Sequence, residues 1–90
     1  MTAQVHRILA ELSDLNPEAV LFDNMDVALI GVGYIADKEP VAVYSRAKMY
    51  AKLLSDGFSR EDADEYYAGK FVAVRAGDLT PVIVDDLQEE

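Results

Sequence analysis

The chain has 90 residues, of which 51% are hydrophobic and 28% charged, with 17 acidic against 8 basic residues and a formal net charge of −9. This size and composition indicate one globular domain, 1–90, that can fold without a metal ion or disulfides. The absence of cysteine excludes disulfides and thiolate metal sites, and the acidic excess disfavours direct binding to nucleic acid or an anionic membrane. A basic protein partner is compatible with this charge, although negative charge also serves solubility.

No apolar run reaches the about 18 residues that a membrane-spanning helix needs. The first residues lack the basic start and long apolar stretch of a signal peptide. We therefore expect the protein in the cytoplasm of a bacterial or infected host cell.

The first predicted element is a helix over 2–15, with Arg7 and Glu11 directed toward water. Its buried stripe consists of Val5, Ile8, Leu9 and Leu12. Two apolar strands follow, over 27–35 and 41–44, and the short connection between them predicts a hairpin.

Two more helices are predicted in the middle of the chain, each beginning at a serine that can cap it. One follows Ser45 to about residue 56 and ends at Gly57, because glycine readily adopts the left-handed conformation of a helix end. The other starts at Ser59 and is closed by Gly69.

The last predicted strands cover 71–74 and 81–84 and would form a second hairpin around a turn at 76–78. The predicted fold class is therefore α+β, with a small antiparallel sheet of about four strands in two hairpins. Two to three helices pack with this sheet, and the element order is α-β-β-α-α-β-β. Residues 85–90 are expected to form a flexible acidic tail.

The predicted strands are apolar at successive positions instead of alternating with polar residues, so both faces of the sheet need cover. Three helices could supply that cover, or a second subunit or another protein could cover one face. A homodimer is therefore one of the expected alternatives.

No pattern typical of a catalytic, cofactor or metal site stands out. The segment Gly31-Val32-Gly33-Tyr34-Ile35-Ala36 matches the G-x-G-x-x-A of dinucleotide-binding units, but Pro40 would end the helix that must follow. His6 is the only histidine, and the serines lie at predicted helix ends. We therefore predict no catalytic residues, no cofactor, no metal and no enzymatic activity.

The candidate partner-binding residues are four carboxylates of the third helix and two tyrosines. The carboxylates are Glu61, Asp62, Asp64 and Glu65. Acidic residues in a first helical turn favourably meet its positive end, which is a sufficient structural reason for them. The functional alternative is that they imitate a row of phosphates toward a nucleic-acid-binding protein. Tyr34 and Tyr44 lie on the first hairpin, and tyrosine is favoured at contact surfaces.

Several short motifs are distributed over most of the chain. They are Asn16-Pro17-Glu18-Ala19, Ala28-Leu29-Ile30-Gly31, Val41-Ala42-Val43-Tyr44 with Lys48, Gly57 with Glu61-Asp62-Ala63, and Gly77 with Thr80-Pro81. Together they resemble a group of small phage and prophage proteins for which no activity is established. The chain departs from that pattern at Ser45, Lys70 and Ala73, where aspartate, asparagine and glycine are usual.

These observations predict a small acidic accessory protein of phage or prophage type that acts by binding an unidentified protein partner. Such a protein would inhibit a host nucleic-acid-binding or defence factor, in the manner of an anti-CRISPR or DNA-mimic protein. The alternative is a homo-oligomeric structural or assembly protein.

Overall fold

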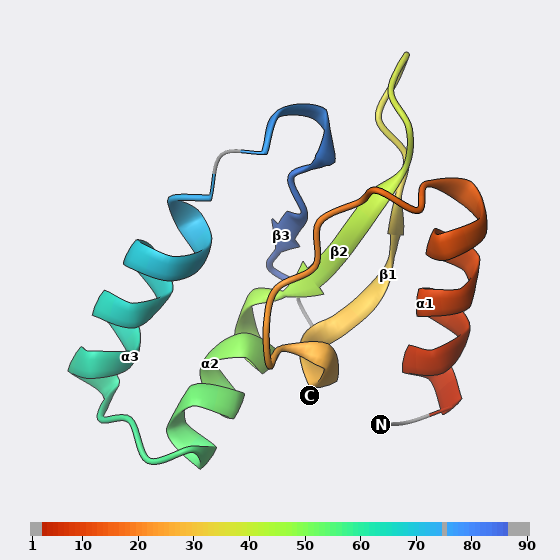
Figure 1. Cartoon of the computed structure of the whole chain (residues 1–90). Helices are drawn as coiled ribbons and strands as arrows, with labels where there is room; N and C mark the ends of the chain where they lie inside the picture. Colours follow the sequence, from red (N-terminus) through yellow and green to blue (C-terminus); the bar gives the residue numbers. More distant parts are fainter. Residues whose placement is uncertain (1–2, 75, 87–90) are drawn as a thin grey trace.

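The computed structural model describes residues 3–74 and 76–86, which fold as a mixed α+β domain around a three-stranded sheet (Figure 1). Helix α1 (Ala3–Leu15) is the first predicted helix, and residue 2 lies outside the described part. It buries Val5 and Leu12 and packs against β1. The prediction of an α+β fold is confirmed, while its strand count is not.

The sheet has the order β1-β2-β3, so β2 is the central strand. Strand β1 (Leu29–Gly33) follows a short 3₁₀ turn, η1 (Asp26–Ala28), and pairs antiparallel with β2 (Val41–Ser45). The first hairpin is thus confirmed, with an irregularity between Leu29 and Gly31. No helix follows the glycine motif, because residues 34–40 form the connection of the hairpin.

Gly33 is required by the close approach of β1 and β2. A Cβ atom at this position would lie 2.8 Å from Cγ2 of Val43, whereas a Cβ at Gly31 would meet nothing within 4 Å. Valine is stiff about its first side-chain torsion, so Val43 cannot easily move aside. The second glycine of the motif therefore serves strand pairing.

The capping residues of the two middle helices act as predicted. Ser45 accepts a hydrogen bond from the Lys48 N–H at the start of α2 (Arg46–Ser55), and Ser59 accepts one from the Asp62 N–H at the start of α3 (Arg60–Tyr67). Gly57 has a φ of 103° and ends α2. The Phe58 N–H then donates to the Leu53 carbonyl, which completes the expected left-handed helix end.

The predicted strand over 71–74 does not exist, and Gly69 does not close the third helix. The chain instead continues from α3 into a π-helical turn, η2 (Ala68–Val72). Phe71 lies four residues after Tyr67 and eight after Ala63, so its side chain extends the inner stripe of α3 into the core. Burial of the Phe71 ring therefore favours helix over strand.

The predicted second hairpin is also wrong. After a short 3₁₀ turn, η3 (Gly77–Leu79), the strand β3 (Val82–Val84) runs parallel to β2. Parallel neighbours need a long crossover, and here α2, α3 and η2 provide it. In Figure 1, the sheet lies between α1, which is beside β1, and the α2–α3 pair.

The core gathers on the sheet face that carries Ala42 and Tyr44. The segment between α1 and η1 contributes Phe22, whose ring centroid is 4.8 Å from that of Tyr44 and 4.9 Å from that of Phe71. The opposite sheet face carries Val43, Val82 and Val84, which are half-buried.

The first two residues of the predicted flexible tail are held in place. Asp85 forms an ion pair of 3.2 Å with Arg46, and the Ser45 hydroxyl donates to Asp86 Oδ1 at 2.6 Å. Residues 87–90 lie outside the described part of the chain.

Candidate protein-binding surfaces

The six candidate residues do not form one surface. Four lie on α3 and one, Tyr34, lies just after β1, and Figure 1 shows α3 and β1 on different sides of the molecule. The sixth, Tyr44, lies in the core. Two separate surfaces are therefore described below.

Tyr44 is completely buried, with 0% of its surface exposed, so it cannot contact a partner in this structure. Its hydroxyl accepts a hydrogen bond from the Phe22 N–H at 3.0 Å. Burial raises the pKa of Tyr44, and the Phe22 hydrogen bond acts in the opposite direction. The proposal of Tyr44 as a contact residue is corrected to a structural role.

The first surface is formed by Glu61, Asp62, Asp64 and Glu65, which we call the α3 surface. All four residues are exposed, while Ala63 among them is fully buried and anchors the helix. The ion pairs between described residues are Lys38–Asp78, Arg46–Asp85 and Lys52–Asp56, so none of them involves this surface.

The positions of the four carboxylates along α3 give them different roles. Glu61 and Asp62 lie in the first turn, where they meet the positive helix end. Asp64 interacts with Tyr50 of α2. Burial of the phenol raises the pKa of Tyr50, and the interaction with the Asp64 carboxylate raises it further. Glu65 lies one turn after Glu61, and like charges at this spacing repel. The charge of Glu65 therefore gains no stabilisation from Glu61 within the helix.

Beside the α3 surface, one arginine at the start of α2 contacts the end of α3 and the residue that follows β3. The Arg46 guanidinium lies 5.6 Å from the ring centroid of Tyr50 and 6.0 Å from that of Tyr67, and it pairs with Asp85. Burial raises the pKa of Tyr67, while the Arg46 charge lowers it. These contacts place the end of α3 beside the start of α2 and the residue after β3.

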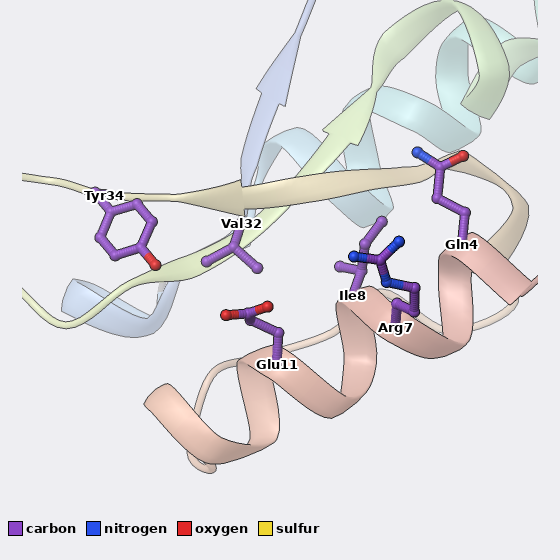
Figure 2. Close-up of a pocket in the computed structure, with 6 residues that line it drawn as sticks. All are labelled: Gln4, Arg7, Ile8, Glu11, Val32 and Tyr34. Carbon is purple, nitrogen blue, oxygen red and sulfur yellow. The ribbon is translucent and has the colours of Figure 1, made fainter.

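The second surface is the α1–β1 groove, a depression of about 420 Å³ between α1 and β1 (Figure 2). Its lining residues are Gln4, Arg7, Ile8, Glu11, Val32 and Tyr34. Figure 2 shows Val32 directed from β1 toward α1, with Glu11 and Tyr34 toward one end and Gln4 and Arg7 toward the other. Tyr34 is 72% exposed, which makes it the most exposed of the large apolar side chains described.

The sequence placed Arg7 and Glu11 on the wet side of α1 but did not identify the groove. Ile8 was assigned to the buried stripe, and it is only half-buried because it also forms the floor of the groove. Recognising the groove requires knowing that β1 is an edge strand next to α1. The only sequence signal was the uncharged run from Gly31 to Ile35 with a tyrosine in it.

Comparison of the chain with protein-family models, with curated proteins and with solved structures found no match. Within residues 3–74 and 76–86, no three histidine, aspartate or glutamate side chains lie close enough together to hold a metal ion. No helix in this part of the chain is long and apolar enough to cross a membrane.

Proposed function

We propose that this protein acts by binding another protein, and that the α3 surface contacts a basic surface of that partner. The observation that supports this proposal is the set of exposed carboxylates at Glu61, Asp62 and Glu65, which have no cationic partner within the described residues. The repulsion between Glu61 and Glu65 costs about 0.2–0.5 kcal/mol. A basic partner would relieve it.

The proposed partner is a host nucleic-acid-binding or defence factor, which the protein would inhibit in the bacterial cytoplasm. Proteins that bind nucleic acid carry lysine and arginine clusters for phosphates. A short row of carboxylates on a rigid helix can occupy such a cluster in place of nucleic acid, and the net charge of −9 favours the encounter. The resemblance to phage and prophage proteins supports this setting.

The test compares the wild-type chain with the variant Glu61→Gln/Asp62→Asn/Glu65→Gln as immobilised bait for a bacterial lysate. We expect the wild type to retain a basic protein that elutes as salt increases, because exposed charges are screened. The variant should bind that protein about tenfold more weakly. Added wild-type chain should also displace nucleic acid from the purified partner in a mobility-shift assay.

The matched control is Glu18→Gln/Asp23→Asn/Glu39→Gln, which removes the same charge from exposed positions outside α3. It should retain the partner as the wild type does. Equal loss of binding by both variants would show that total charge matters and the α3 surface does not. Direct binding of the purified chain to nucleic acid at physiological salt would also contradict the proposal.

Measuring the oligomeric state distinguishes the proposed inhibitor from the alternative, a homo-oligomeric structural or assembly protein. The proposed inhibitor needs no second copy, so size exclusion with light scattering should give the mass of a monomer. A stable dimer without a retained partner would favour the alternative.

A further inference from the structure

We propose that the edge of β1 and the α1–β1 groove together bind an extended peptide segment of a partner protein, which adds to the sheet beside β1. This site is separate from the α3 surface and does not depend on its function. Three features carry the proposal: an open strand edge, an apolar groove floor, and charges of opposite sign toward the two ends of the groove.

The open edge belongs to β1, which has β2 on one side only. Among the described residues, the backbone of 30–33 forms hydrogen bonds with no element except β2. Sheet edges are usually protected by charge, by proline or by shortness. Strand β3 is three residues long and follows Pro81, whereas β1 has five residues without charge or proline. The outer N–H and C=O groups of β1 are thus available to an extended chain.

The groove beside this edge has an apolar floor. Ile8 of α1 and Val32 of β1 are both half-buried, and they approach the groove from its two sides (Figure 2). Successive side chains of an added strand point to opposite faces, so every second residue would project toward α1. One of these residues should be apolar, because it would cover Ile8 and Val32.

The charges in the groove define the neighbours of that apolar residue. Arg7 and Glu11 are one helical turn apart, about 6 Å along the axis, which is close to the about 6.6 Å between residues on one face of a strand. The Glu11 carboxylate and the exposed ring of Tyr34 both attract a cation. A lysine or arginine two positions from the apolar residue fits this end, and an acidic or polar residue fits the end near Arg7. The net charge of −9 favours a basic peptide overall.

A peptide fits this edge better than a second copy of the chain. Pairing β1 with β1 of another copy would bring the second α1 against the first, because α1 packs beside β1. It would also join two chains that each carry a charge of −9. An extended segment without a flanking helix avoids both difficulties. Strand addition of this kind is a common mode of peptide recognition.

Selection of random heptapeptides displayed on phage, with the full chain as bait, tests the proposal. We expect enriched peptides in which an apolar residue is separated by one position from a lysine or arginine. In an NMR titration with an enriched synthetic peptide, shift changes should concentrate in residues 4–11 and 30–34, and outer β1 amides should exchange more slowly. Methylation of the peptide nitrogens that face β1 should abolish binding.

Charge variants separate this site from the α3 surface. Glu11→Lys should weaken binding of the enriched peptide about fivefold or more, while Glu18→Lys, a change at another exposed position outside the groove, should leave the affinity within about twofold. The Glu61→Gln/Asp62→Asn/Glu65→Gln variant should bind the peptide as the wild type does. The proposal is overturned if no peptide is enriched, if shift changes map to α3, or if Glu11→Lys has no effect. A dimer whose β1 amides are protected without peptide would identify a second copy as the occupant and would also overturn it.

Discussion

The Tyr44 hydroxyl is the acceptor for the Phe22 N–H, and this hydrogen bond joins the central strand to the segment that covers it. Both residues are buried, so water cannot replace the bond if it is lost. The Phe22 and Phe71 rings pack around the same point. One hydroxyl therefore connects three parts of the chain that are distant in sequence.

Replacement of Tyr44 by phenylalanine should lower the free energy of unfolding by about 1–3 kcal/mol, because it leaves the buried Phe22 N–H without an acceptor. The matched change Tyr34→Phe should have an effect within about 0.5 kcal/mol, since Tyr34 is 72% exposed. Urea unfolding followed by circular dichroism measures both values. Equal stability of the two variants would show that the Phe22–Tyr44 bond contributes nothing.

The same hydroxyl makes stability depend on alkaline pH. The pKa of Tyr44 is raised from its ordinary value of 10.0, mainly by burial, so the folded protein keeps a proton that the unfolded chain loses. The contribution of Tyr44 to the free energy of unfolding should therefore be constant below about pH 9 and fall as the pH rises past about 10. The Tyr44→Phe variant should lose less stability over this interval. Tyr50 and Tyr67, whose pKa values are also raised, account for the loss that remains.

At the scale of elements, the serine caps of α2 and α3 and the glycine end of α2 were the best predicted features of the chain. Ser45, Ser59 and Gly57 act through local backbone geometry, which sequence neighbours determine. The predicted strand over 71–74 was wrong because four apolar residues fit a strand and a helix equally well. The burial of Phe71 in the core, which the sequence does not show, favours the helix. The prediction that Tyr44 is a contact residue was wrong for a similar reason, since a strand residue can face either side of a sheet.

The two capping serines differ in one contact, which allows a paired test. Ser59→Ala removes an exposed cap and should cost about 1 kcal/mol. Ser45→Ala removes a cap and also the hydrogen bond to the Asp86 carboxylate, and bonds to charged groups contribute about 1.5–3 kcal/mol. We expect the second variant to be clearly less stable in urea, with faster hydrogen exchange of the β3 amides. Equal costs would mean that the Ser45–Asp86 hydrogen bond does not help to hold β3.

At the scale of the whole molecule, carboxylates outnumber cationic side chains about two to one. Of the three ion pairs within residues 3–74 and 76–86, Lys38–Asp78 and Arg46–Asp85 are largely exposed, and such pairs contribute little. The net charge therefore opposes the folded state, and the same excess is what the α3 surface would offer to a basic partner.

Salt should accordingly stabilise the free protein. Raising the salt concentration from about 0.02 M to about 0.3 M shortens the screening length and should raise the free energy of unfolding by about 1 kcal/mol, or about 4–8 °C in Tm. Thermal unfolding followed by circular dichroism measures the change, with sucrose at equal osmolality as the control for general exclusion effects. A fall in Tm with salt would show that attractive charge pairs dominate.

The parallel pairing of β2 with β3 has a consequence for incomplete chains. Val43 lies opposite Val82 in that pairing, so β2 gains its second neighbour only after 38 intervening residues. A fragment that stops before Val82 would leave one edge of the uncharged strand β2 unpaired and would remove Ile83, which packs against the core. Premature termination or proteolytic nicking ahead of β3 should therefore give an aggregating product instead of a smaller soluble domain.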